Sequence, residues 1–548
     1  MTTSDHLQTI RDGYTFGGEP TLTLGAAVVE DAVHADVPVT LPLGMLNRHG
    51  LVAGATGTGK TKTVQFMAEQ LSEAGVPVFL ADVKGDLSGL ATPGEPSDKL
   101  AERTQATGMD WAPAGYPVEF LALGGDGVGV PVRATVDSFG PVLLARIMDL
   151  NETQESCLQL MFHWADERDL PLDDLKDLKA LVTHLTSDEG KEDLKGLGGV
   201  AKATANVILR EVTGLQADGM DQFFGVPEFE TAELLRTAPD GRGVVSCLEL
   251  PTLQSKPQLF STFMIWLLAD LFQELPEAGD LDRPKLVFFL DEAHLVFKGA
   301  SKAFLESITT TVRLIRSKGV GLFFVTQNPT DVPAEVLGQL ANRVQHALRA
   351  FTPTDAKALR ASVATFPHTE YDLEKVLTSA KVGEAVVTVM DPDGAPTPVA
   401  LTRMWSPRSL MSPSTPETMQ AVLAASPLME MYGTAQDRDS AFELLQRRAQ
   451  EAEAEAAAQA QADEAAARSE AERREYERGY AQTSVPASTG RARATSAPRQ
   501  ERSDFDRALG NFMKSAGTQI GREVTRSLFG TRRRRSSGGG LLGKILGG

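Results

Sequence analysis

The sequence predicts an α/β fold with a mainly parallel sheet, a large helical insertion and a helical C-terminal tail. Between about residues 47 and 410, short apolar runs alternate with amphipathic patterns. This alternation is typical of parallel strands joined by crossover helices. A glycine-rich string follows the first of these strands, and an acidic pair ends a later one. Because ligands of such sheets gather at the carboxyl ends of strands, we expect both features at one edge.

The core elements follow from the spacing of apolar residues. A buried strand over 51–53 leads into the glycine-rich string, and a helix over 61–74 follows it with Val64, Met67, Ala68 and Leu71 on one face. A second strand covers 76–83. Further strands are expected at 286–290, 321–326, 343–350 and 385–390, with a helix at about 300–317.

The segments around this core have different compositions. Residues 1–46 contain short β-like runs, so we expect a short N-terminal β segment and an ATPase-type core over 47–410. Between about 90 and 280 lies an insertion with long helical patterns, which predicts a helical subdomain packed on the core. The expected helices cover 140–167, 173–185, 200–215 and 257–275.

The C-terminal part divides into two segments. Residues 411–482 form an Ala/Glu-rich segment that favours helix but lacks the apolar a/d positions of a coiled coil. Residues 483–548 are basic and predicted to be largely disordered, with an amphipathic helix over 505–529. That helix either docks on its own protein or binds a neighbouring subunit or an unidentified protein partner.

Composition limits the class of protein. The two cysteines, Cys157 and Cys247, fit a reducing compartment and lack the spacing of a zinc site. We expect a cytoplasmic protein without a signal peptide or transmembrane segment, because the longest apolar stretch, 259–272, is shorter than the ~20 residues of a spanning helix. The net charge of the whole chain is −19. Because the tail 483–548 carries +9, residues 1–482 carry −28. An acidic body disfavours nucleic acid as a partner over the whole surface.

The glycine-rich string GATGTGKT fits the P-loop (Walker A) pattern G-x-x-x-x-G-K-[ST], with a strand before it and a helix after it. Such a loop binds phosphates through backbone N–H groups at a helix N-terminus. Lys60 is expected to reach the β- and γ-phosphates of ATP, and Thr61 to bind Mg²⁺. The predicted nucleotide-binding residues are Gly54, Ala55, Thr56, Gly57, Thr58, Gly59, Lys60, Thr61 and Lys62.

The acidic pair of KLVFFLDEAH ends a buried strand and completes the predicted catalytic site. Asp291 is expected to hold Mg²⁺, and Glu292 to orient or deprotonate the attacking water. A later strand ends in Thr326 and Gln327, and the amide of Gln327 would sense the γ-phosphate. The interpretation of Gln327 as an ordinary turn residue stays open.

Two further features bear on this site. Arg313, Arg316, Arg343 and Arg349 are candidates for an arginine finger that completes a neighbour's site, and we favour Arg316 because it precedes the Gln327 strand at a helix end. The loop ADVKGDLSG, with Asp82, Lys84 and Asp86, follows the second strand. It either lies beside the nucleotide or forms a cap and turn.

The combination of motifs resembles the FtsK–HerA superfamily of P-loop ATPases, and more closely the bacterial helicase HerA-like C-terminal domain proteins. The strings that carry the resemblance are NRHGLVAGATGTGKT, FLADVKGD, KLVFFLDEAH, RLIRSKGVGLFFVTQNP and LGQLANRVQHALRAF. The resemblance implies a RecA-like core, a hexameric ring with ATP between subunits, and a central pore that moves DNA. In related coupling ATPases an arginine finger precedes the sensor glutamine by eleven residues, as Arg316 precedes Gln327. The first 46 residues are too short for the N-terminal barrel of HerA.

Three functions therefore remain open from the sequence. The resemblance favours an ATP-hydrolysing, ring-type DNA translocase or helicase-like motor acting on double-stranded DNA. The acidic body is better suited to an ATPase that moves or remodels proteins, as secretion ATPases of the superfamily do. A nucleotidase without DNA activity is the third.

Overall fold

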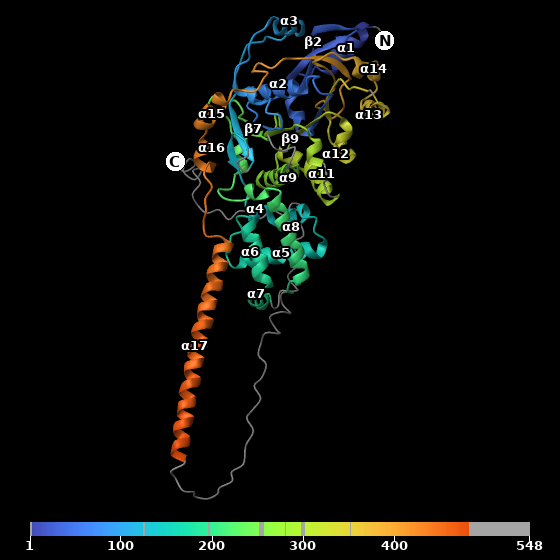
Figure 1. Cartoon of the computed structure of the whole chain (residues 1–548). Coiled ribbons are helices and arrows are strands. Elements are labelled where there is room, and N and C mark those ends of the chain that lie inside the picture. The colour runs from blue at the N-terminus through green and yellow to red at the C-terminus, as the bar shows by residue number, and fades with distance from the viewer. Residues whose placement is uncertain are drawn as a thin grey trace.

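A computed structural model of the chain describes residues 3–123, 127–194, 198–250, 257–279, 281–297, 302–350 and 352–481. The predicted basic tail over 483–548 and its amphipathic helix over 505–529 lie outside these residues. The described chain forms a large sheet covered by helices, a group of helices at one end, and one long helix that projects from that end (Figure 1).

The sheet contains 12 strands within the described residues, in the order β2-β1-β12-β11-β10-β3-β9-β8-β4-β7-β5-β6. Their bounds are β1 (Thr21–Val29), β2 (Ala32–Pro42), β3 (Gly50–Ala53), β4 (Val78–Asp82), β5 (Val118–Leu123), β6 (Val130–Val132), β7 (Val245–Glu249), β8 (Leu286–Leu290), β9 (Val320–Thr326), β10 (Asn342–His346), β11 (Glu384–Thr388) and β12 (Ala400–Met404).

The strands from β10 to β6 all pair in parallel, whereas β2, β1, β12 and β11 form an antiparallel edge. The prediction of an α/β fold with a mainly parallel sheet is confirmed. In the centre, β9 lies between β3 and β8, with Ala53 opposite Thr326 and Leu290 opposite Phe324. The carboxyl ends of β3, β9 and β8 therefore meet at one edge of the sheet.

Helices pack on this sheet and connect its strands. The central ones are α2 (Lys60–Glu73), α9 (Pro257–Glu274), α10 (His294–Phe297) and α11 (Lys302–Ile315), with α3 (Asp98–Thr107), α12 (Ala334–Leu337), α13 (Pro353–Val363) and α14 (Leu373–Ser379) around them. Buried apolar residues from the two sides of the sheet form two large clusters. Phe79 and Phe288 pack in one of them, and Phe289 and Phe323 in the other.

The N-terminal segment differs from the expectation of a few strands alone. Residues 3–13 form the helix α1 (Thr3–Gly13), which the sequence analysis did not predict. The strands β1 and β2 belong to the central sheet, because β1 pairs with β12. This pairing supplies hydrogen-bond partners for an edge of β12 that would otherwise be open.

The insertion also differs, because it is not helical throughout. Its strands β5, β6 and β7 extend the parallel sheet beyond β4. These runs of three to six residues are too short to show a clear period. The helices are α4 (Val136–Ile147), α5 (Glu152–Glu167), α6 (Leu175–Thr186), α7 (Asp188–Asp193) and α8 (Lys202–Ala217).

The helix expected over 140–167 is in fact two. Gly140 adopts a φ of +74° in front of Pro141, which bends the chain inside α4. A second helix, α5, begins after Asn151, whose side chain accepts the backbone N–H of Gln154 in a capping box. Local capping therefore overrides the continuous apolar pattern of this segment.

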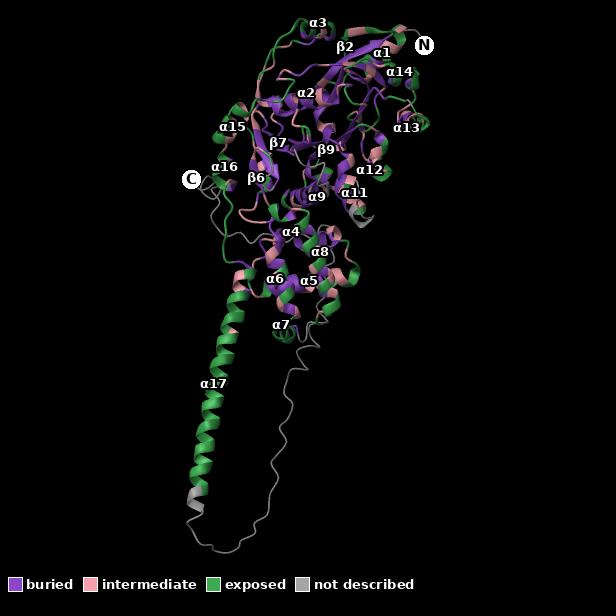
Figure 2. Cartoon of the chain, in the orientation of Figure 1, coloured by how far each residue is buried: buried purple, intermediate pink, exposed green. Residues whose placement is uncertain are grey.

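After β12 the chain crosses α2 and then forms α15 (Pro416–Ala425), α16 (Pro427–Tyr432) and α17 (Ala441–Ala481). The start of α17 is anchored on α6, because the buried carboxylate of Asp177 accepts hydrogen bonds from Ser440 and Phe442. From residue 446 to residue 478, α17 is exposed apart from the half-buried Ala452 (Figure 2). Among the described helices, none has the length and apolar character needed to span a membrane.

Candidate active site

The glycine-rich string forms a tight loop between β3 and α2. Gly54, Gly57 and Gly59 have φ values of +153°, +76° and +118°, a region that other residues rarely adopt. A Cβ on Gly54 would also lie 2.5 Å from the Cβ of His346. Because α2 begins at Lys60, the loop presents the N-terminus of a 14-residue helix, where backbone N–H groups and the helix dipole favour phosphate.

Three predicted residues lie in the first turn of α2. The ammonium group of Lys60 is buried and donates hydrogen bonds to the carbonyls of Gly54 at 2.6 Å and Ala55 at 3.3 Å. Burial, with Lys84 nearby, lowers the pKa of Lys60. Thr61 is half-buried beside it. Lys62 directs its side chain away from the loop, to the carbonyl of Met411 at 2.6 Å.

A buried histidine that no sequence motif marks packs against this loop. His346, at the end of β10, contacts the Thr63 hydroxyl with Nε2 at 2.9 Å and the Glu384 carbonyl with Nδ1 at 3.0 Å. Burial lowers its pKa to about 3, so the imidazole is neutral at physiological pH. It fixes α2 against the sheet.

Asp291 and Glu292 follow β8, two strands away from β3. Asp291 is buried, and within the described part of the chain its Oδ2 has no hydrogen-bond partner. Burial raises the pKa of this carboxyl to about 6. A buried carboxylate oxygen without a donor suits a hard cation, so Asp291 and Thr61 fit the Mg²⁺ of a P-loop site.

The carboxylate of Glu292 lies among three polar side chains. Its Oε1 is 2.6 Å from the Lys84 ammonium and 3.5 Å from Nε2 of Gln327, and its Oε2 is 3.3 Å from Nδ1 of His294. Burial alone would raise the pKa of Glu292, but the hydrogen bond and charge of Lys84 hold it below the usual value. Glu292 also has a φ of +48°, a backbone conformation that costs energy for a residue with a Cβ.

The structure brings Gln327 to this carboxylate because β9 lies between β3 and β8. The turn after β9 is fixed by Asp331, which accepts hydrogen bonds from the Thr326 hydroxyl at 2.7 Å and the Asn328 backbone at 3.1 Å. Gln327 therefore projects from an ordered turn and lies 3.5 Å from Glu292, while its contact with a γ-phosphate stays a prediction.

Arg316 does not join this group within one chain. It is exposed on a 3₁₀ turn (Arg316–Lys318) at the amino end of β9, whereas Gln327 follows the carboxyl end. The seven residues of β9 separate the two by roughly 23 Å, at about 3.3 Å per residue. Arg343, another candidate, donates to the carbonyls of Thr365 and Leu340 and holds local structure.

The loop ADVKGDLSG after β4 forms the cap and turn that the sequence left open as one alternative. Asp82 caps the turn: its Oδ1 accepts the backbone N–H groups of Lys84 and Gly85, and its Oδ2 accepts that of Leu87. This turn positions the ammonium group of Lys84 next to the carboxylate of Glu292. A position of this loop beside the nucleotide stays a prediction, and no motif in the sequence indicates the contact between Lys84 and Glu292.

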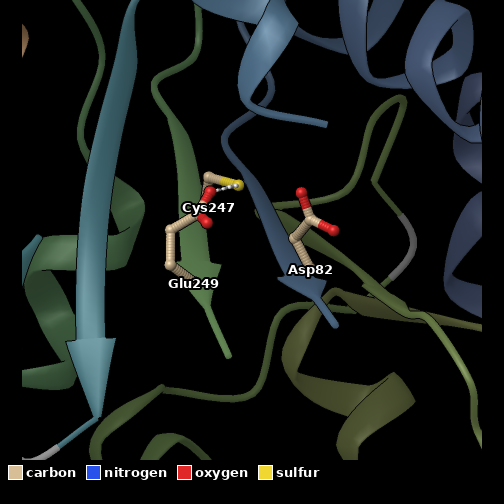
Figure 3. Close-up of side chains that lie close together, drawn as sticks. All are labelled: Asp82, Cys247 and Glu249. Atoms are coloured by element: carbon tan, nitrogen blue, oxygen red, sulfur yellow. Dashed lines mark hydrogen bonds between the residues drawn. The ribbon is translucent and has the colours of Figure 1, made fainter. Parts of the chain in front are cut away.

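A buried cluster of Asp82, Cys247 and Glu249 lies behind this loop, on β4 and β7 (Figure 3). One ligand atom of each lies within 4.8 Å of the others. Burial and the charge of Asp82 raise the pKa of Glu249 to about 7, and the Cys247 thiol is 3.8 Å from Glu249 Oε1. Because Asp82 already accepts three backbone N–H groups, we interpret the cluster as support for the loop.

Comparison with known proteins places the chain in a family. The family model described as helicase HerA-like C-terminal matches residues 28–536. The chain belongs to this family. The motif resemblance is therefore confirmed over nearly the whole sequence.

Individual relatives are distant. The DNA double-strand break repair helicase HerA of Sulfurisphaera tokodaii is 22% identical over 369 residues, or 66% of each chain. A probable helicase of Methanocaldococcus jannaschii is 35% identical over 117 residues, or 21% of each chain. The chain thus spans 66% of the length of the curated HerA relatives.

Among solved structures, the bacterial conjugative coupling protein TrwB is 16% identical, with a TM-score of 0.47 over 73% of this chain and 98% of that one. VirB4 of Thermoanaerobacter pseudethanolicus is 14% identical, with a TM-score of 0.44 over 74% of this chain and all of that one. Other TrwB structures are described as complexes with a non-hydrolysable ATP analogue and with ADP and Mg²⁺.

The raised pKa of Asp291 leads to a prediction for Mg²⁺. Since the carboxyl has a pKa of about 6, it is ionised above that value and increasingly protonated below it, where a proton competes with the cation. The Mg²⁺-dependent part of ATP affinity should therefore fall about tenfold for each pH unit below about 6. Calorimetric titrations with Mg²⁺ and with EDTA across this range measure it. In Asp291→Asn the Mg²⁺-dependent part of ATP affinity should be absent at every pH. If Mg²⁺ changed the ATP affinity of the unmodified protein equally at every pH, Asp291 would not be the Mg²⁺ ligand.

Proposed function

We propose that this chain is an ATP-hydrolysing motor that assembles as a ring, most simply a hexamer, and translocates along double-stranded DNA in the cytoplasm. The observation that carries the hydrolysis is the convergence of Glu292 and Gln327 beside the P-loop strand, with β9 between β3 and β8. Membership of the HerA-like family supports the motor and its substrate.

In this proposal each residue has a distinct role. The N–H groups of residues 54–62 and the Lys60 ammonium bind the phosphates, while Thr61 and Asp291 hold Mg²⁺. The Mg²⁺ ion would neutralise charge on the β- and γ-phosphates. Glu292 orients the attacking water and accepts its proton, and Gln327 contacts the γ-phosphate from the end of β9.

Arg316 completes the site of a neighbouring subunit in this account. Its exposure and its distance from the Glu292 end of β9 support action in another chain's site. A guanidinium there stabilises the charge of the transition state by about 10³–10⁵ in rate.

The acidic body gives a second candidate function. Residues 1–482 carry a net charge of −28, which suits a protein substrate better than a polyanion. In this alternative the same ATPase site drives the movement or remodelling of a protein, and the C-terminal tail recruits it.

The two candidates differ in their response to DNA. Double-stranded DNA should stimulate ATP turnover of the full chain at low salt, and the stimulation should fall steeply as salt rises, because Lys and Arg contacts with phosphates release counterions. A steady-state ATPase assay over a series of salt concentrations measures it, with Lys60→Ala as the inactive control. Turnover that is indifferent to DNA at low salt would contradict the translocase and favour the protein substrate.

Mixing of variants tests the ring. Arg316→Ala and Lys60→Ala should each abolish turnover, whereas a mixture should recover part of it, because a subunit with an intact P-loop then receives Arg316 from its neighbour. ATPase assays of the mixture across several ratios measure the recovery. Arg360→Ala, an exposed arginine on α13 outside the four finger candidates, serves as the matched control and should keep its activity. A mixed assembly without recovery would contradict the role of Arg316.

A further inference from the structure

Lys84 has the contacts of a residue that acts on the catalytic glutamate. Its ammonium group is 2.6 Å from Oε1 of Glu292, which makes this one of the short ion pairs among the described residues. The two partners differ in exposure: the Glu292 side chain is 7% exposed and that of Lys84 is 40% exposed. The carboxylate is therefore enclosed by the protein, whereas the lysine reaches it from the open side.

The backbone of Lys84 is held while its side chain can move. The three N–H groups that Asp82 accepts, at 2.8–3.1 Å, fix the turn from Lys84 to Leu87. Cys247 and Glu249 lie beside Asp82 on the neighbouring strand β7, and Asp82 is fully buried (Figure 3). By contrast, four rotatable bonds join the ammonium to this fixed turn, so it can change partner without a backbone movement.

The contact with Lys84 leaves Glu292 badly placed to receive a proton from water. Its Oε1 is occupied by Lys84 and faces Gln327 at 3.5 Å. Its Oε2 is buried without a hydrogen-bond partner in the described chain, next to His294. A general base must lie within hydrogen-bond distance of the water that it deprotonates. While Lys84 stays on Oε1, its ammonium competes with a water for this oxygen and lowers its basicity, so release of the ammonium would favour proton transfer.

A bound ATP would offer Lys84 another partner. Lys60 and Asp291, which bracket the expected γ-phosphate, both interact electrostatically with Lys84. A triphosphate placed between them brings several negative charges toward the same ammonium. Opposite charges at such short range attract each other, so the phosphates would compete with Glu292 for the ammonium.

We propose that Lys84 is a positioning residue that clamps Glu292 in the nucleotide-free site and leaves it for the γ-phosphate when ATP binds. This inference rests on the proposed ATP binding and adds a control step to it. The clamp keeps the base from acting until a nucleotide is in place, and part of the energy of ATP binding is used to open it.

A double-mutant cycle on nucleotide affinity isolates this step. The four proteins are the unmodified chain, Lys84→Met, Glu292→Gln and the double variant, and the probe is the non-hydrolysable ATP analogue adenylyl imidodiphosphate with Mg²⁺. Loss of the lysine's direct attraction to phosphate weakens binding in both backgrounds and cancels in the cycle. If ATP opens the clamp, binding must break the contact between Lys84 and Glu292, and Lys84→Met removes that cost. Relative to its effect in the Glu292→Gln background, Lys84→Met should therefore improve affinity more, or weaken it less, in the chain that keeps Glu292. The expected difference is up to about fivefold, the factor for an ion pair of ~1 kcal/mol.

The controls separate this inference from the proposed function. Lys84→Arg keeps a cation on the same turn. The effect of Glu292→Gln on affinity for the analogue should therefore be the same in Lys84→Arg as in the unmodified chain. Lys176→Met removes a lysine of equal exposure from α6 and should change nothing. A cycle with no difference between the two backgrounds, or one in which ATP strengthens the pair, would overturn the clamp. If the unmodified chain did not bind the analogue, and Lys60→Ala gave the same result, the proposed ATP site itself would be wrong.

Discussion

The parallel pairing of β3, β9, β8 and β4 is the constraint on which the rest of this structure depends. Because these strands run in one direction, their carboxyl ends meet at a single edge. That edge receives the P-loop, Gln327, the Asp291–Glu292 pair and the Lys84 turn from segments separated by up to about 270 residues. A strand order in which β9 did not neighbour β8 would separate Gln327 from Glu292.

Burial then gives these side chains their chemistry. It lowers the pKa of Lys60 and raises that of Asp291 to about 6, so each charged group gains from an opposite charge brought by a ligand. Glu292 departs from this pattern because Lys84 already supplies a positive charge and keeps its pKa low. These charges suit phosphates and a divalent cation, while the carboxylate of Glu292 is held by a lysine from the loop after β4.

Much of this site could be predicted because its motifs are local. The glycines that need positive φ, the lysine that follows them and the acidic pair at a strand end each lie within a few residues in the sequence. The mainly parallel sheet followed from alternating apolar patterns. The contact between Lys84 and Glu292 could not be predicted, because it joins residues 208 positions apart and depends on β4 pairing with β8. The strands β5 to β7 could not be predicted because short apolar runs beside long helices show no clear period. The break between α4 and α5 could not be predicted because it depends on the helix cap at Asn151.

The central claim is that Glu292 is the base of an ATP-hydrolysing site, and Glu292→Gln tests it most directly. ATP binding and turnover should be measured on the same preparation, with Glu335→Gln, an exposed glutamate on α12, as the matched control. The account predicts that Glu292→Gln binds ATP but loses turnover by about 10²–10⁴, the contribution of a general base, while the control behaves as the unmodified chain. Turnover that survives in Glu292→Gln while ATP still binds would contradict the account.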